Sequence, residues 1–257
     1  MALRSVIAAV VLALAGCADL PRAHRLEIAG ESYPVQWTQA PGRAQVLLIL
    51  EPGYARRCSH LRGTARRLAE VGALVLCLDA PMAAGNPLLA DAFAGWLAGG
   101  LRDPQGRAVP PRVVVGGLSA GAAFALRLGA RLNDLVPDRL AGALLLDPVA
   151  TPSFASDLQR VAQGRPVLAL LAEAHACNAN HSALPSLRAA GVDAVALGAG
   201  STHLDAEGED GDPLGRAICG TPEPAAVEAL RARAAQWLRG VAGAQAGPKI
   251  RSASVGT

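Results

Sequence analysis

Aromatic residues and lysine are scarce in this chain. Only 3% of its 257 residues are aromatic, and Lys249 is the single lysine, so arginine carries nearly all of the positive charge. The arginines are spread along the sequence without a basic run or an interleaved aromatic patch, and the formal net charge is only +3. These features exclude the usual pattern of a nucleic-acid-binding surface. The core must be built mainly from Ala, Val and Leu.

Other signatures are absent as well. No glycine-rich phosphate loop or dinucleotide fingerprint follows the first buried strand, and the cysteines do not have the spacing of zinc ligands. We therefore expect no cofactor and no metal. With 51% apolar and 18% charged residues, the length suits one globular domain with a sizeable core, which we place at 17–240.

The first 17 residues resemble a bacterial lipoprotein signal. A short positive start precedes an apolar run, Val6 to Ala15, that is too short to span a bilayer, and the run ends in Leu14-Ala15-Gly16-Cys17. The resemblance implies removal of 1–16, lipidation of Cys17 and a tether to the cell envelope. Ala18 after the cysteine implies sorting to the outer membrane. The alternative is an ordinary secretory signal with an incidental cysteine.

Apolar strands and amphipathic helices alternate through the rest of the chain. This alternation predicts an α/β fold with a mainly parallel sheet covered by helices on both faces. The expected strands are 24–28, 33–38, 45–50, 73–78, 113–115, 141–146, 166–171 and 193–197. The expected helices are 59–71, 87–101, 120–132, 156–162, 182–190 and 224–238, and a polar tail is expected over 241–257.

The most informative stretch is Gly117-Leu118-Ser119-Ala120-Gly121, which follows the β-branched run 113–115 and precedes a helix. A serine on a sharp turn between a strand and a helix is typical of a nucleophile elbow. Gly117 and Gly121 would remove side chains that clash across this turn. We predict Ser119 as a nucleophile; the alternative is a tight turn with a solvent-facing hydroxyl.

A serine nucleophile needs a base, and the base needs an acid. His203 follows the last predicted strand, whereas the other four histidines lie before the core, at a helix start or in the loop after 166–171. Asp147 and Glu173 each follow a strand and compete for the role of acid. We favour Asp147 because Pro148 holds it stiffly at its strand end. The order Ser, Asp, His is the one found in α/β-hydrolases.

Developing negative charge in the transition state requires backbone N–H donors. The residue after the nucleophile, Ala120, supplies one donor. The second is expected after strand 45–50, in the turn that contains Gly53 and Tyr54. We predict that the N–H of Tyr54 completes the oxyanion hole and that its ring lines the substrate pocket; the alternative for Tyr54 is a surface aromatic on a loop.

Four motifs together resemble a group of known enzymes. They are Pro-Gly-Tyr-Ala at 52–55, Gly-Leu-Ser-Ala-Gly at 117–121, Leu-Asp-Pro-Val at 146–149 and Gly-Ser-Thr-His at 200–203. The combination resembles α/β-hydrolases of the cutinase-like polyesterase, chlorophyllase and platelet-activating-factor acetylhydrolase group. Cutinases carry the acid after the strand equivalent to 166–171, whereas the other two use the position of Asp147. The resemblance implies hydrolysis of carboxylic esters through an acyl-enzyme.

Four cysteines remain after Cys17, which allows three pairings in an exported chain. In the implied fold, Cys177 and Cys219 both follow strands on the catalytic side, so a disulfide between them would fasten the His203 loop. Whether Cys58 and Cys77 also pair stays open, because Cys77 lies inside a predicted strand, where it would equally fit as a small core residue.

The segment between Asp147 and Pro166 is too short for a helical cap domain. An uncapped site would be open to small-molecule or polymeric esters. The sequence therefore predicts a monomeric, envelope-tethered serine ester hydrolase. Two alternatives stay open: an acyltransferase or thioesterase that uses the same triad, and a non-catalytic envelope binding protein that keeps the fold.

Overall fold

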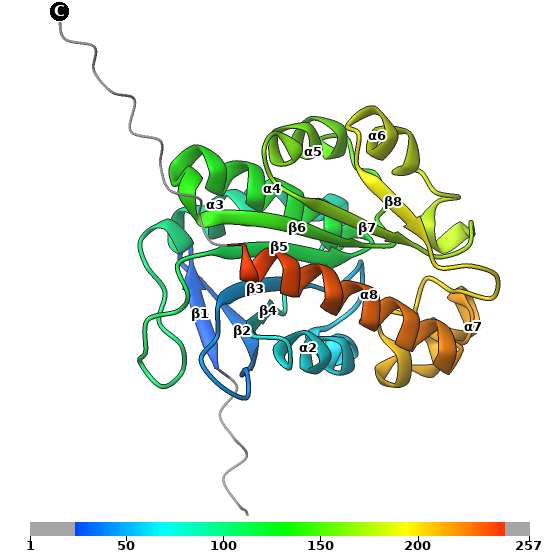
Figure 1. Ribbon diagram of the computed structural model, residues 1–257, viewed down its shortest axis with the longest axis horizontal. Helices are drawn as coiled ribbons and strands as arrows, with labels where there is room; N and C mark the ends of the chain where they lie inside the picture. The colour runs from blue at the N-terminus through cyan, green and yellow to red at the C-terminus, as the bar shows by residue number, and fades with distance from the viewer. Residues whose placement is uncertain (1–23, 245–257) are drawn as a thin grey trace, which may run out of the picture.

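The computed structural model describes residues 24–244, which form one eight-stranded sheet with helices on both faces (Figure 1). Cys17 and the predicted signal 1–16 lie outside the described residues. The sheet order is β1-β2-β4-β3-β5-β6-β7-β8. The strands are β1 (Arg25–Ile28), β2 (Glu31–Thr38), β3 (Val46–Glu51), β4 (Ala73–Leu78), β5 (Val113–Leu118), β6 (Leu140–Leu146), β7 (Val167–Leu171) and β8 (Asp193–Ala196).

The strand directions agree with the predicted fold class. β1 and β2 form an antiparallel opening, and β2 joins β4 antiparallel. From β4 onward every neighbouring pair is parallel. The central strands β3, β4, β5 and β6 are buried along their whole length, because helices cover both faces of a parallel sheet. The carboxyl ends of the parallel strands therefore share one edge, where ligands bind in such sheets.

Two helical layers cover the sheet. One layer contains α3 (Pro87–Ala98), α4 (Ala120–Leu135), α5 (Phe154–Ala162) and α6 (Leu184–Ala189); the other contains α2 (Arg62–Ala69) and α8 (Pro224–Gly243). The first layer holds all three phenylalanines of the chain, each at most 1% exposed. The short helix α7 (Pro213–Cys219) lies beyond the strand ends. Single 3-10 turns occur at Cys58–Leu61, Ala83–Gly85, Pro137–Arg139, Ala176–Asn178 and Gly208–Asp210.

The end of the chain differs from the prediction. The closing helix continues to Gly243, so the predicted tail 241–257 begins inside it. Val241 is buried in the core, and Arg112 donates hydrogen bonds to the carbonyl oxygens of Val241 and Ala242. These contacts extend the helix past Gly240, where the sequence indicates a stop. Residues 245–257 lie outside the described part of the chain.

Between β6 and β7 the structure has only α5 and its connecting loops, so the described chain has no cap domain there. Within residues 24–244, no helix combines the length and the apolar character that crossing a bilayer requires.

Candidate active site

Ser119 sits in a sharply turned backbone between β5 and α4. Its φ is 56° and its ψ is −120°, and a positive φ is costly for a residue with a side chain. The two flanking glycines make this turn sterically feasible. A Cβ on Gly117 would lie 2.4 Å from the backbone of Gly121, and a Cβ on Gly121 would lie 2.2 Å from the carbonyl oxygen of Pro52. The segment therefore has the geometry of a nucleophile elbow.

Asp147 and His203 are joined by a short hydrogen bond. The Nδ1 atom of His203 lies 2.6 Å from Oδ2 of Asp147, and both side chains are buried. Asp147 follows β6 directly with φ 40°, and its N–H donates to the carbonyl of Leu170. A carboxylate on Nδ1 fixes the ring orientation and leaves Nε2 for a second partner.

The loop that carries His203 is tied down by its own residues. Asp205 accepts hydrogen bonds from the N–H and the hydroxyl of Thr202, and it is fully buried. Burial raises the pKa of the Asp205 carboxyl above its usual value. Asp205 therefore holds the loop in shape, whereas the ring of His203 is oriented by Asp147.

Asn178, which the sequence did not single out, completes the surroundings of Asp147. Its Nδ2 lies 3.1 and 3.3 Å from the two carboxylate oxygens of Asp147, and its Oδ1 accepts from the N–H groups of His175 and His181. The N–H of Ala172 also donates to Asp147. Asn178 is fully buried, so it links Asp147 to the loop after β7.

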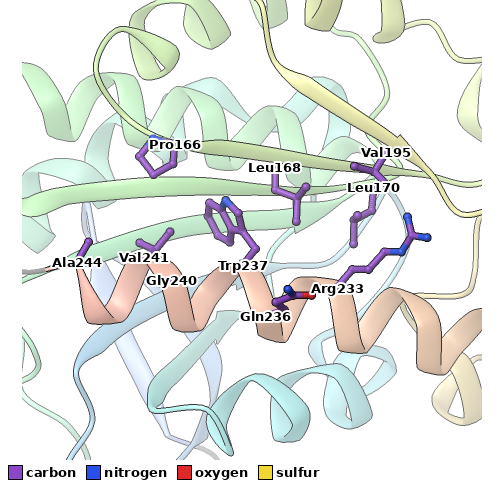
Figure 2. Close-up of a pocket in the computed structure, with 10 residues that line it drawn as sticks. All are labelled: Pro166, Leu168, Leu170, Val195, Arg233, Gln236, Trp237, Gly240, Val241 and Ala244. Carbon is purple, nitrogen blue, oxygen red and sulfur yellow. The ribbon is translucent and has the colours of Figure 1, made fainter.

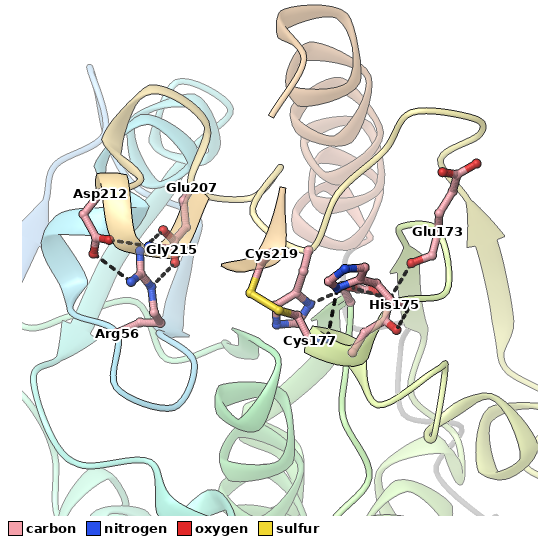
Figure 3. The surroundings of a disulfide bond; sticks show 11 residues. Arg56, Glu173, His175, Cys177, Glu207, Asp212, Gly215 and Cys219 are labelled. Atoms are coloured by element: carbon pink, nitrogen blue, oxygen red, sulfur yellow. Dashed lines mark hydrogen bonds and ion pairs between the residues drawn. A yellow bond between two sulfur atoms is a disulfide. The ribbon is translucent and has the colours of Figure 1, made fainter. Parts of the chain in front are cut away.

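Glu173, the competing acid, is exposed, and its carboxylate points away from the Cys177–Cys219 disulfide (Figure 3). Its main-chain N–H donates to Ser201. The structure therefore brings Asp147 to His203 and leaves the Glu173 side chain outside this arrangement.

Ser119 and His203 line the same cavity of about 360 Å³ at the carboxyl ends of the strands. The turn after β3 forms part of its wall: a Cβ on Gly53 would lie 3.2 Å from Cβ of Ser119. Tyr54 also lines the cavity, and it is 68% exposed. Ala120 is the first residue of α4, whose N–H has no acceptor inside the helix. Of the two residues predicted to form the oxyanion hole, Tyr54 thus lines the cavity with Ser119, and Ala120 directly follows Ser119 in the chain.

Arg56 connects the turn after β3 to the histidine loop. Its guanidinium donates to both carboxylate oxygens of Glu207 and, at 2.7 Å, to Asp212 (Figure 3). Glu207 is fully buried and follows His203 by four residues. Hydrogen bonding to Glu207 raises the pKa of Arg56 above its already high value. The sequence did not predict this pairing, because Arg56 and Glu207 are 151 residues apart.

Two disulfides are present, Cys177–Cys219 and Cys58–Cys77. The first lines the cavity and joins the loop of Asn178 to α7, as the sequence favoured (Figure 3). The second joins the 3-10 turn after Arg57 to β4, so Cys77 is both buried and paired.

A larger hollow lies elsewhere. A groove of about 660 Å³ separates α8 from β7 and β8, and it is lined mainly by apolar side chains such as Trp237 and Leu168 (Figure 2). Arg233 is its only charged lining residue, and none of the predicted site residues reaches it. The smaller cavity around Ser119 is therefore the candidate active site. In residues 24–244, no cluster of His, Cys, Asp and Glu could hold a metal ion.

No protein-family model and no curated protein matches this sequence. Solved structures do match it in fold. A variant of the esterase rPPE is 18% identical with a TM-score of 0.64, and the match covers 94% of this chain and 91% of that one. A thermostable esterase from Pseudomonas putida is 16% identical with a TM-score of 0.60, covering 94% and 91% of the two chains. A dienelactone hydrolase from Anabaena variabilis is 17% identical with a TM-score of 0.58, covering 84% and 94%.

These likenesses and the sheet order define an α/β-hydrolase fold. Within that fold, the chain presents a serine elbow and an Asp-His pair at the carboxyl ends of three strands.

Proposed function

We propose that the protein is a serine hydrolase that cleaves carboxylic esters through an acyl-enzyme. One observation carries this proposal: the 2.6 Å contact between Asp147 and His203 occurs beside a cavity that His203 shares with the strained Ser119. A serine becomes nucleophilic when a neighbouring base takes its proton, and an imidazole held by a buried carboxylate is such a base.

Each residue then has a defined task. Ser119 attacks the ester carbonyl carbon while His203 Nε2 accepts its proton. Asp147 stabilises the resulting imidazolium. The N–H groups of Tyr54 and Ala120 donate to the oxyanion. His203 next protonates the leaving alcohol. Water then attacks the acyl carbon while His203 accepts its proton, and His203 returns a proton to the Ser119 oxygen as the acid is released.

The comparisons support this choice of chemistry. The solved structures of similar fold are named as esterases and dienelactone hydrolases. Their identity to this chain is low, so the closer assignment to cutinase-like, chlorophyllase-like or acetylhydrolase-like enzymes rests on the sequence motifs. We propose the esterase activity without assigning it to one of these subgroups.

The test is covalent labelling of the soluble domain with a fluorophosphonate probe, together with hydrolysis of a short-chain activated ester. We expect labelling and turnover in the natural protein and neither in Ser119→Ala. An unlabelled natural protein would favour a non-catalytic binding role. Labelling that survives in Ser119→Ala would exclude Ser119 as the nucleophile.

We further propose that the domain is tethered to the bacterial cell envelope through lipidated Cys17, at the outer membrane. The support is the tetrapeptide that ends at Cys17 and the apolar run before it. Metabolic labelling with a palmitate analogue should mark the natural chain and not Cys17→Ser. Equal labelling of the two chains would rule out this anchor.

A further inference from the structure

The candidate active site has an unusually apolar rim. Five large apolar side chains are strongly exposed in residues 24–244, and three of them, Tyr54, Leu214 and Ile218, line the cavity that contains Ser119. Leu214 is 70% exposed and Ile218 is 60% exposed. A single exposed apolar residue is ordinary, but a cluster beside a reactive group indicates a binding surface.

Leu214 and Ile218 belong to α7, which is held firmly in place. Asp212 caps the helix by accepting from the N–H of Gly215, and Cys219 ties the last turn to Cys177. Gly215 packs against the guanidinium of Arg56, where an added Cβ would lie 3.0 Å from a nitrogen atom. The two apolar side chains four residues apart therefore face outward from a fixed wall.

The charges near this wall are already paired. Arg56 is the only cationic side chain that lines the cavity besides the His203 ring. Its nitrogens bind the carboxylates of Glu207 and Asp212, so one positive charge faces two negative ones. A carboxylate on the substrate would meet no free cation here and would be repelled.

We infer that α7 determines the substrate specificity of the site: its wall of Leu214 and Ile218 selects esters that carry an uncharged, apolar hydrocarbon chain. This inference rests on the proposed esterase function and adds the substrate class to it. The chain would lie on Leu214, Ile218 and the Tyr54 ring while the ester carbonyl reaches Ser119.

The effect should be graded with chain length. Full burial of one methylene favours binding about fourfold, and an open wall covers only part of each methylene. We expect kcat/KM for p-nitrophenyl esters to rise about twofold per methylene from acetate towards octanoate. In the double variant Leu214→Ser/Ile218→Ser, the octanoate-to-acetate ratio should fall about tenfold.

Leu88→Ser is the matched control. Leu88 is the most exposed of the five side chains, at 82%, and it does not line the cavity. Its replacement should leave the octanoate-to-acetate ratio unchanged. An octanoate-to-acetate ratio that falls equally in Leu88→Ser and in the double variant would overturn the inference. The inference would also be overturned if the double variant kept the chain-length dependence of the natural protein both for these acyl esters and for acetates of longer alcohols.

Charge gives a second readout. An ester of octanoate length with a terminal carboxylate should be hydrolysed at least about tenfold more slowly than the uncharged ester. Equal or faster hydrolysis would contradict selection for uncharged chains. Both esters are hydrolysed by the same protein, so differences in folding between variants do not affect this comparison.

Binding separates this inference from the esterase proposal. Calorimetric titration of Ser119→Ala with intact esters measures chain recognition without turnover, and the same α7 substitutions can be added to that background. Tighter binding of longer chains that α7 substitution weakens supports the wall even if the natural protein hydrolyses nothing. Chain-independent binding together with active hydrolysis refutes the wall and leaves the esterase proposal standing.

Discussion

The imidazole of His203 and the carboxylate of Asp147 lie 2.6 Å apart although 56 residues separate them in sequence. The exposed Glu173 is the other carboxylate that the sequence offered. Asp147→Asn should therefore lower kcat by about 10⁴, because the amide holds the wrong tautomer of the histidine. Glu173→Gln should retain turnover close to that of the natural protein. Steady-state kinetics on an activated ester compares the two, and a larger loss in Glu173→Gln would reverse the assignment.

Asn178 should act as a positioning residue for Asp147. Asn178→Ala removes a donor from a buried carboxylate and leaves the N–H groups of His175 and His181 without their acceptor. We expect a loss of unfolding free energy of about 1–3 kcal/mol and a shifted pH profile of kcat/KM. Asn180→Gly is the control, since Asn180 is exposed with φ 51°, which glycine tolerates. An unshifted pH profile in Asn178→Ala would leave Asn178 a purely structural role.

The Arg56–Glu207 pair should be far more sensitive to single than to double substitution. Arg56→Met leaves the fully buried carboxylate of Glu207 without its guanidinium partner, which should lower the free energy of unfolding by about 3–5 kcal/mol. Arg56→Met/Glu207→Leu removes both charges and should recover most of that stability. Denaturant unfolding of both variants measures this. If the double variant is as unstable as the single, the loss comes from packing around the turn.

The two disulfides should contribute similarly to stability and differently to activity. Their cysteines are 42 and 19 residues apart, so loss of each bond should cost about 4 and about 3 kcal/mol in the chain-entropy estimate. Cys177→Ser/Cys219→Ser frees the cavity wall and should raise KM, whereas Cys58→Ser/Cys77→Ser should not. Kinetics below the unfolding transition tests this, and a thiol assay that finds all four of these cysteines free in the natural protein would exclude both bonds.

Glu51 should make stability depend on pH. It is fully buried at the end of β3, its Oε2 has no hydrogen-bond partner among the described residues, and burial raises its pKa well above the usual range. Above the unfolded pKa of about 4.3, the folded state holds a proton that the unfolded state has lost. The free energy of unfolding therefore falls as the pH rises from the pKa of Glu51 in the unfolded state towards its raised pKa in the folded state. Glu51→Gln should gain stability relative to the natural protein as the pH rises above about 4.3, and a stability difference that does not change with pH would contradict the raised pKa.

The sequence was sufficient for the parts of the site that depend on local pattern. Ser119 lies between a β-branched run and a small-residue helix, and Asp147 and His203 follow apolar strands. Parallel pairing brings such strand ends to one edge whatever the loop lengths. The sheet class follows from the alternation of strands and helices, and the prediction of an uncapped site follows from the short segment between Asp147 and Pro166.

Residues held by remote partners were harder to find. α7 is only seven residues long, contains Gly215 and exposes its apolar side chains, so it has no amphipathic period to detect. Its position depends on Asp212 and on the bond to Cys177. Asn178 lies in an irregular loop, and the residues that flank it in sequence do not indicate that its side-chain amide is buried. An Arg and a Glu about 150 residues apart likewise give no sequence signal of their pairing.

The close packing of Gly121 has a consequence for how the candidate active site could be lost. Replacing Ser119 by alanine would remove one oxygen atom and leave the elbow standing. A single methyl group at 121 would meet the carbonyl oxygen of Pro52 at 2.2 Å, and Pro52 begins the turn that holds Tyr54. Gly121 therefore tolerates substitution less well than Ser119 does. A mutation at 119 should give a stable, inactive protein, whereas a mutation at 121 should disturb the folding of the elbow itself.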